Sequence, residues 1–282
     1  MQTQQGYGLR PTPFDARDFP IEKVLGAAAI GALPQEYIVS TPLVIKDQTD
    51  TDMCTAFALT AVSEDQEGLA LDPSYTFFKT KQRTGDIDSW GADLRNACKS
   101  ATKKYGGFLP MSRYGDTQRT FDQAERDRAA RGEGFTKTDD WTAKKYAKQT
   151  YLSVKPIGDV FDGMRSAMWQ TRSEERSVFT GIDWNPKWNR VDGGAIDADI
   201  GRGEPSFGHA IKIFGWSGEW MLAQLSNGKE IGDGGIFKLE RGVVNEFCTY
   251  GAFTLLDLPR EDAERALGKI GWFSYWLKSV FA

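Results

Sequence analysis

The sequence predicts an α+β fold, in one large domain or in two lobes that share a cleft. The chain has 282 residues and a mass of 31.4 kDa, more than a usual single domain, and 40% of it is hydrophobic. The stretch 44–64 passes from a short apolar strand through a polar turn into small apolar residues at helical spacing. Further along, alternating or continuous apolar runs are typical of antiparallel strands and lie at 177–184, 209–216, 220–226 and 235–240.

The charge distribution and the N-terminus limit the classes of partner and location. The formal net charge is −4, and charges of both signs are scattered along the chain, which argues against a broad basic face for nucleic acid. The first twenty residues lack the basic start and apolar run of a secretory signal, and no stretch reaches the ~18 apolar residues of a membrane span. We expect no nucleic-acid partner, no transmembrane segment, and a location in the cytoplasm or in a larger particle such as a virus.

The three cysteines are odd in number and include no C-x-x-C pair, which argues against a disulfide framework and a zinc site. Cys98 and Cys248 lie in apolar patterns and are predicted to be buried, inert thiols. Cys54 falls in the first turn of the predicted helix, where exposed N–H groups favour the nucleophilic thiolate. The alternative is a small apolar residue at the start of a buried helix.

A glutamine and the only histidine of the chain supply the other parts of an acyl-transfer site. Gln48 lies six residues before Cys54, so its amide and the Cys54 N–H are the two donors that an oxyanion needs. His209, in "FGHAIKIFGW", lies about 155 residues downstream. Among apolar residues it is also typical of a buried core ring. Together with Cys54 and Gln48, it favours the general base of a Cys/His hydrolase.

These segments resemble the papain-like (C1-type) cysteine peptidases, in particular the bacterial members that lack a long propeptide. "LPQEY" and "PLVIKDQTDTDMCTAFA" are similar to the family's opening segment, "FGHAIKIFGW" to its histidine strand, and "GDGGIFKLERG" to the strand and turn after its third catalytic position. The resemblance implies a helical lobe, an antiparallel β-barrel-like lobe, and an active site in the cleft between them. It gives Cys54 the role of nucleophile, His209 that of base and Gln48 that of oxyanion donor, with no metal and no organic cofactor.

The resemblance also implies a strip that holds the backbone of a peptide or protein substrate. The segment that begins "LDPSYTFFKTKQRTGDIDSWGADLRNACKS" is similar to the one in which the family carries a glycine-containing strip beside the cleft. It makes Ser89, Trp90 and Gly91 the substrate-binding candidates.

One departure from the family's pattern concerns the residue that orients the histidine. Aligned without gaps back from "GDGGIFKLERG", the family's Asn-Ser-Trp-Gly becomes Leu-Ser-Asn-Gly, so Leu225 stands where asparagine is expected. Leucine cannot accept the ring N–H, the bond that orients the imidazole in triads. Asn227 is two residues further on and faces the same side of a strand, so a small slip or bulge would bring it into use. Gln224 is the second candidate.

A second departure lies just before the nucleophile, where Asp52 and Met53 replace the family's usual small residues. A carboxylate this close raises the pKa of the thiol by like-charge repulsion unless it points to water. Thr55 follows the cysteine, as in many bacterial relatives.

The anchors divide the chain into four parts. They are an N-terminal extension (1–32), a helical lobe (33–150), a β lobe (151–258) and a C-terminal amphipathic aromatic helix (259–282). The extension contains "PFDARDFP", which resembles a short element ahead of the bacterial peptidases, and we expect it on the surface or along the cleft. The helical lobe ends in a charged insert (113–150), predicted as a solvated helix and loop. In the β lobe, a helix is predicted near 157–172, and the glycine-rich loop 185–206 is predicted to be a flexible rim without calcium-loop spacing.

The C-terminal helix carries apolar residues at helical spacing, and its tryptophans and tyrosine widen that face. We expect it to pack on the chain's own lobes or to dock on a partner or an assembly, and interfacial attachment to a membrane is the third alternative. Two functional hypotheses follow. The first is a papain-like cysteine endopeptidase, weakened by the loss of the usual asparagine. The second is a catalytically impaired papain-fold module of a larger assembly such as a virus particle, docked by this helix.

Overall fold

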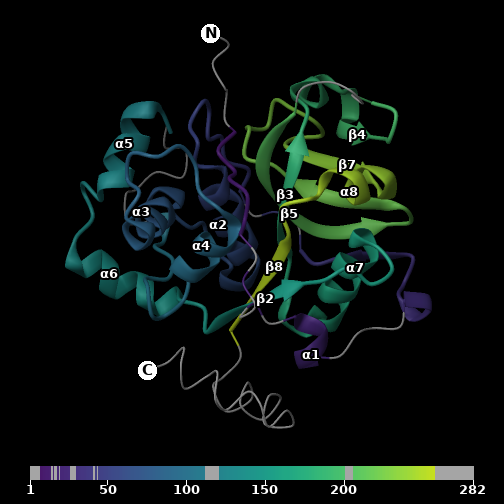
Figure 1. The fold of residues 1–282 in the computed structure, drawn as a ribbon, viewed down its shortest axis with the longest axis horizontal. Helices are drawn as coiled ribbons and strands as arrows, with labels where there is room; N and C mark the ends of the chain where they lie inside the picture. The colour runs from purple at the N-terminus through teal and green to yellow at the C-terminus, as the bar shows by residue number, and fades with distance from the viewer. Residues whose placement is uncertain are drawn as a thin grey trace.

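The computed structural model describes the ranges 7–13, 15, 18, 20–25, 30–40, 42, 44–111, 121–200 and 206–257. Within them the helices α2 to α6 gather on one side and a twisted sheet with α7 and α8 on the other, as Figure 1 shows. The predicted α+β class of two lobes is confirmed. The predicted C-terminal helix 259–282 lies outside the described residues.

The helical lobe is built around α2 (Cys54–Glu67), whose first eleven residues are all buried. Small side chains on every face let other elements approach it from all sides, as the alanines in the sequence predict. The helices α3 (Pro73–Thr84), α4 (Leu94–Ser100) and α5 (Gln123–Arg131) each begin after an aspartate whose carboxylate accepts a backbone N–H of the first turn. A threonine capping box opens the last helix, α6 (Lys137–Ala143).

The second lobe holds a mostly antiparallel sheet in the order β2-β8-β3-β5-β6-β7-β4, and the described strands form an open path rather than a closed barrel. The outer strands on one side are β2 (Thr150–Val154) and β8 (Ala252–Leu256), followed by β3 (Val178–Trp184) and the long β5 (Phe207–Ser217). The other side holds β6 (Trp220–Gln224), β7 (Ile236–Glu240) and the two-residue β4 (Ala195–Ile196), which pairs in parallel with β7. The short β1 (Glu36–Ile38), from the part of the sequence assigned to the helical lobe, pairs with β5.

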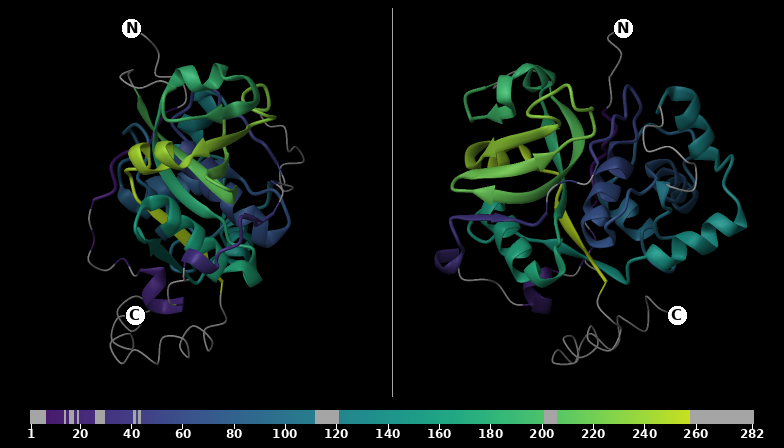
Figure 2. Two further views of the ribbon diagram at one scale, coloured as in Figure 1. Left: turned by 90° about the vertical axis from the view of Figure 1, so that its right-hand side faces the viewer. Right: turned by 180° about the vertical axis from the view of Figure 1, so that it is seen from behind.

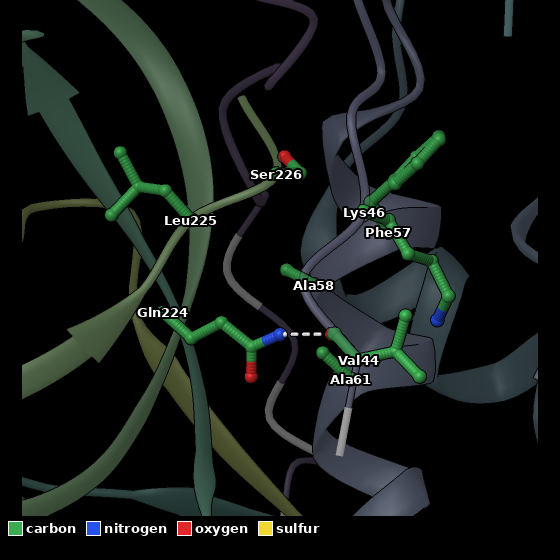
Figure 3. Close-up of a pocket in the computed structure, with 8 residues that line it drawn as sticks. All are labelled: Val44, Lys46, Phe57, Ala58, Ala61, Gln224, Leu225 and Ser226. Atoms are coloured by element: carbon green, nitrogen blue, oxygen red, sulfur yellow. Dashed lines mark hydrogen bonds between the residues drawn. The ribbon is translucent and has the colours of Figure 1, made fainter. Parts of the chain in front are cut away.

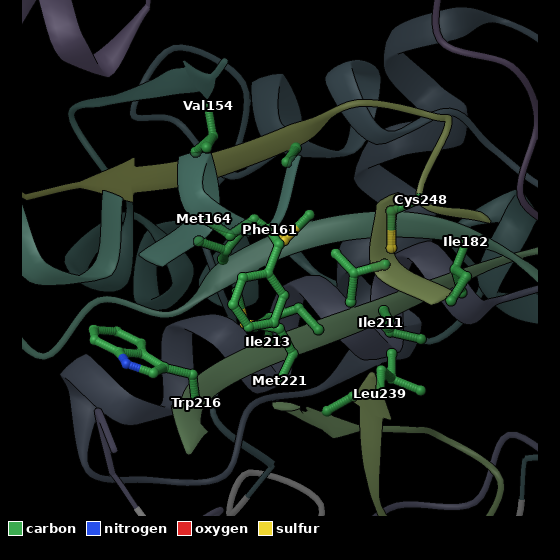
Figure 4. Packing of buried hydrophobic residues seen from close by; sticks show 14 of the residues in the cluster. Val154, Phe161, Met164, Ile182, Ile211, Ile213, Trp216, Met221, Leu239 and Cys248 are labelled. Atoms are coloured by element: carbon green, nitrogen blue, oxygen red, sulfur yellow. The ribbon is translucent and has the colours of Figure 1, made fainter. Parts of the chain in front are cut away.

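The helices α7 (Val160–Gln170) and α8 (Arg241–Phe247) complete the core of this lobe. Phe161 and Met164 of α7 face Ile211, Ile213 and Trp216 of β5 in the packing drawn in Figure 4. The helix predicted near 157–172 is α7, and the predicted bounds agree with the observed ones to within three residues at each end. The strongly periodic apolar face of this segment made the prediction possible.

Shorter elements connect these parts. They are α1 (Ile21–Leu25) and the 3-10 turns Ile30–Ala32, Lys144–Tyr146, Arg172–Glu174, Pro186–Arg190 and Asp192–Gly194. The last two turns and β4 lie in the loop predicted as a flexible rim, where Trp188 is fully buried against Trp184. The buried tryptophan packs this part of the loop against β3. Within the part of the chain that the structure describes, no helix has the length and apolar character required to cross a membrane.

Candidate active site

Cys54 is the first residue of α2 and is completely buried where the helix meets β5. Its sulfur accepts the backbone N–H groups of Ala210 and Gly8. Burial raises the pKa of the Cys54 thiol to about 11, while these two N–H donors and that of Thr55 oppose the shift. Ala210 directly follows His209 in β5, so Cys54 lies against the β5 backbone at the residue next to the histidine.

His209 lies near the start of β5, opposite Ile182 of β3, and is also completely buried. Burial lowers the pKa of its imidazole to about 4, and an interaction with the Asn227 side chain opposes that change. Among the described residues, neither ring nitrogen has a hydrogen-bond partner of good geometry, and the same holds for Asn227 Oδ1. Asn227 therefore lies close to the imidazole ring but forms no hydrogen bond of good geometry with it.

The segment after β6 explains why Asn227, and not Leu225, lies near the histidine. Leu225 is buried in the core of the β lobe, and Figure 3 shows it pointing away from α2. The chain then leaves the sheet and pairs with residues 46–48, with Gln48 N–H bonded to Ser226 O at 2.7 Å and Asn227 bridged to Asp47. The pairing partner thus changes from β7 to the segment before α2.

Gln224, the second candidate, is directed elsewhere. Its Nε2 donates to Val44 O at 2.9 Å across a pocket of about 10 Å³, which is room for about one water molecule (Figure 3). This hydrogen bond therefore joins β6 to the segment before α2.

Gln48 is fully buried beside these residues. Its Nε2 donates to Thr51 O at 2.8 Å, and its Oε1 accepts the hydroxyl of Ser226. Both ends of the amide are thereby oriented, which fixes the direction of its N–H groups in the turn before Cys54.

Residues 7–13 of the N-terminal extension pass between the two lobes in both Figure 1 and Figure 2. Leu9 N–H donates to Gly208 O at 3.1 Å, Arg10 N–H donates to Ala92 O at 2.9 Å, and Gly8 O accepts Ala92 N–H at 2.9 Å. The segment Tyr7–Arg10 is thus bonded to both walls in the manner of an extended peptide, and its Gly8 N–H contacts the sulfur of Cys54.

Glycines on both sides allow this close approach. A Cβ added to Gly8 would lie 2.1 Å from Asp52 O, and one added to Gly91 would lie 1.7 Å from Gly8 O. Leu9 is buried over Gly181 of β3, where an added Cβ would meet its Cδ2 at 2.2 Å. The cleft therefore has no room for larger residues while the extension is in place.

Tyr7 covers the histidine. Its ring stacks on Phe207 at 5.3 Å and meets the His209 ring edge-on at the same centroid distance. Together with Trp184 on β3, whose ring lies 6.3 Å from the imidazole, it excludes water from the ring. This cover is the physical cause of the lowered pKa of His209.

The predicted substrate strip lies against the extension. Ser89 Oγ accepts Arg10 Nη1 at 3.1 Å, and Trp90, which is 41% exposed, donates its ring N–H to Tyr7 O at 2.8 Å. The backbone pairing itself falls one residue later, on Ala92, which the sequence reasoning missed. Backbone N–H and C=O groups are common to all residues, so no side-chain signal marks this position.

Asp52, for which the sequence left open whether it points to water, is fully buried. It lies in an ion pair with Arg126 of α5, with Arg126 Nε 2.8 Å from Asp52 Oδ1. It is among the groups that raise the pKa of Cys54, after burial as the main cause. Its neighbour Met53 is buried among apolar residues of the helical lobe.

Cys98 and Cys248 are both buried, and burial raises the pKa of each thiol, to about 12 for Cys248. Cys248 lies in the core of the β lobe, and Cys98 packs in the same apolar cluster as Leu9. No cluster of three or more His, Cys, Asp and Glu side chains suited to a metal ion occurs within the described ranges.

Comparison with known proteins reveals similarity in structure only. No protein-family model and no curated protein sequence matches the chain. Among solved structures, xylellain, a cysteine protease from Xylella fastidiosa, matches with a TM-score of 0.71 at 20% identity, over 92% of this chain and 98% of its own. Procathepsin L 3 from the larval midgut of Tenebrio molitor matches with a TM-score of 0.58 at 14% identity, over 90% and 76%.

The bromelain protease from Ananas comosus, solved in complex with the E64 inhibitor, also matches. Its TM-score is 0.55 at 15% identity, over 79% of this chain and 99% of its own. The chain therefore has the fold of the papain-like cysteine proteases, and the resemblance read from the sequence is confirmed at the level of the fold.

Proposed function

We propose that the protein is a papain-like cysteine endopeptidase that is dormant while residues 7–10 lie in its cleft. The observation that supports the proposal is that the Cys54 sulfur, at the start of α2, accepts the N–H of Ala210 in the other lobe, the residue next to His209. The segment that holds Gln48 pairs with the segment that holds Asn227, and the Asn227 side chain interacts with the His209 ring, which also supports the proposal.

In the open enzyme, His209 takes the proton of Cys54 and the thiolate attacks the carbonyl carbon of the scissile peptide bond. The Cys54 N–H and the Gln48 amide stabilise the oxyanion that develops. His209 then gives its proton to the leaving amine, and water hydrolyses the thioester with His209 again as the base. Asn227 takes the orienting role that Leu225 cannot fill.

The arrangement with the extension in place favours the neutral thiol and the neutral imidazole. Burial raises the pKa of Cys54 to about 11 and lowers that of His209 to about 4, so neither group is charged near pH 7. The extension also presents Gly8 N–H to the sulfur, where a substrate would present a carbonyl carbon. Displacement of residues 7–10 hydrates both groups and brings the two pKa values closer, which is the condition for a reactive thiolate.

The first prediction tests this proposal with Gly8→Val. The new side chain cannot fit against Asp52 O, so the segment leaves the cleft while the catalytic residues are unchanged. We expect labelling of Cys54 by an epoxysuccinyl peptide, and hydrolysis of casein, to rise about 10-fold or more over the unaltered chain.

Gly31→Val is the matched control, because it lies in the same extension and its new Cβ would meet no atom within 4 Å. Cys54→Ala in the Gly8→Val chain must abolish both signals. Equal, slow labelling of all three cysteines after Gly8→Val would refute the enzyme. It would favour the alternative, a non-catalytic module of a larger assembly, for which Leu225 at the asparagine position is the supporting observation.

A docking role for residues 259–282, and a location in the cytoplasm or in a viral particle, remain proposals from the sequence.

A further inference from the structure

The strip beside the cleft has no regular secondary structure, so its backbone groups need other partners. Gly91 has a φ of +65°, and residues 89–91 lie between the end of α3 and the start of α4. Buried backbone N–H and C=O groups without helix or sheet partners must be satisfied by side chains or water. Here the side chains that satisfy them are charged.

The first charged group is Asp52, two residues before the nucleophile. Its carboxylate accepts the Gly91 N–H and two nitrogens of Arg126, Nε at 2.8 Å and Nη2 at 2.9 Å. Arg126 Nη2 also donates to Ser89 O at 2.8 Å. One buried ion pair therefore holds both ends of the strip, with geometry close to the bidentate fork of arginine and carboxylate.

The second cation is Lys81 of α3, whose side chain is completely shielded from solvent. Its Nζ donates to Ser89 O at 2.6 Å and to Gly91 O at 2.7 Å. The Ser89 and Gly91 carbonyls and the Gly91 N–H are thus bound by charged side chains. These side chains come from the segment before α2, from α3 and from α5. Charged donors and acceptors make the shorter and stronger hydrogen bonds, so these positions are sharply defined.

The residue that follows the strip is the one that pairs with peptide backbone. Ala92 donates its N–H to Gly8 O and accepts Arg10 N–H, both at 2.9 Å. Both bonds depend on where the chain leaves Gly91, because Ala92 is joined directly to it. A shift of the strip would move both hydrogen-bonding groups of Ala92 out of register with an extended peptide in the cleft.

We propose that Asp52, Arg126 and Lys81 are positioning residues that hold Ser89–Gly91 so that Ala92 can pair with the backbone of a peptide bound in the cleft. For substrate peptides this rests on the proposed function, whereas the pairing with Gly8 and Arg10 does not. The charged insert 113–150 thereby acquires a role at the site through Arg126.

The experiment compares Arg126→Gln with Arg128→Gln in the full chain. Both substitutions remove one arginine from α5, but Arg128 is 59% exposed and pairs only with Glu125 within the helix, so it serves as the matched control. Amide hydrogen exchange of residues 89–92 is the first measurement. We expect about 10-fold faster exchange in Arg126→Gln and no change in Arg128→Gln.

The double variant Asp52→Asn with Arg126→Gln guards against a folding defect, since it leaves no unpaired buried charge and retains an acceptor for Gly91 N–H. It still lacks the bond of Arg126 to Ser89 O, so we expect residues 89–92 to exchange about as fast as in Arg126→Gln. Equal exchange in the Arg126→Gln and Arg128→Gln chains would overturn the proposal. A double variant as well protected as the unaltered chain would also overturn it, because the unpaired Asp52 charge would then be the cause of the faster exchange.

Kinetics in the Gly8→Val background give the second measurement. Positioning predicts a KM for peptide substrates about 10-fold higher in Arg126→Gln with kcat nearly unchanged, because the backbone contacts and not the reacting atoms are affected. A lower kcat at constant KM would overturn the positioning role. If no variant hydrolyses peptides, the proposed function fails, and hydrogen exchange still decides the role of the three charged residues.

Discussion

The ionisation of Cys54 and His209 illustrates how burial controls a residue. For each residue, a contacting group opposes the effect of burial on the pKa. The N–H of Ala210 does so for the Cys54 sulfur, and the Asn227 side chain does so for the His209 ring. Desolvation is nevertheless the largest cause for both. Water access to the cleft is therefore the variable that determines the charge of the pair.

The pH dependence of stability measures this effect on His209. In the unfolded chain the imidazole binds a proton below pH ~6.5, whereas in the folded chain its pKa is lowered to about 4. The unfolded state therefore binds more protons between these values, and the stability present above pH ~6.5 is lost as the pH falls toward 4. We expect the unaltered chain to lose about 2 kcal/mol more than His209→Gln between pH 7 and pH 5.

Urea denaturation at the two pH values is the measurement, and the comparison with His209→Gln cancels the contribution of the carboxylates. An equal loss in both chains would show that the imidazole is protonated, and hence hydrated, in the folded state.

Individual site residues differ in how far the sequence determines them. The positions of Cys54 at a helix start and of His209 near a strand start were predictable, because both are local sequence patterns. The approach of Asn227 depends on the chain leaving the sheet after Gln224, which no local pattern encodes. The partner of Asp52, Arg126, is 74 residues away, so the pair could only be found in three dimensions.

Among the elements, α2 is held by ion pairs near its C-terminal end, one of which joins the two lobes. Glu64, Asp65 and Glu67 near its C-terminal end each bind a lysine from another segment, Lys46, Lys212 and Lys148 respectively. Lys212 is on β5, three residues after His209, and its side chain and that of Asp65 are each 1% exposed. These pairs fix the depth and rotation of the helix that carries Cys54.

Removal of one partner from the pair between α2 and β5 should be strongly destabilising. Asp65→Ala leaves the Lys212 ammonium buried without its carboxylate, which costs about 3–5 kcal/mol of unfolding free energy. Asp65→Ala combined with Lys212→Met replaces the pair by apolar groups and should regain most of that loss. Urea denaturation of the single and the double variant checks this, and a single variant as stable as the double would show that water reaches Lys212.

The sequence predicted the strands of the sheet better than the charged insert. In strands such as β5, apolar residues alternate or are continuous over the whole length, so the strand can be recognised from its sequence pattern alone. The insert was predicted as solvated because its charges alternate in sign, and its helices α5 and α6 do form there. That one arginine of α5 points into the protein was not predictable, because a buried and a solvated arginine have the same sequence signal.

At the scale of the whole molecule, the extension joins the two lobes at a second place. Asp18 accepts Arg95 Nε from α4 at 2.7 Å and the Tyr151 hydroxyl from β2 at 3.3 Å, and Arg95 also donates to Pro13 O. The first contact, at Gly8–Arg10, lies in the cleft. The extension is therefore part of the folded structure as well as a cover for the site.

The two contacts can be separated by substitution. Asp18→Ala leaves Arg95, whose side chain is only 9% exposed, without its carboxylate, and we expect a loss of about 3 kcal/mol or more of unfolding free energy. Asp15→Ala is the control, because its pair with Lys99 is longer, at 3.5 Å, and more exposed, so its loss should be about 0–1 kcal/mol.

The labelling of Cys54 then distinguishes an extension held as one unit from one held at two independent places. If the contacts are independent, Asp18→Ala leaves the bonds of Leu9 and Arg10 intact, and labelling by the epoxysuccinyl peptide rises far less than in Gly8→Val. If they form one unit, the two variants label alike. We expect the first result, because Gly8, Leu9 and Arg10 bond to both walls of the cleft through their own backbone and do not require Asp18 for that pairing.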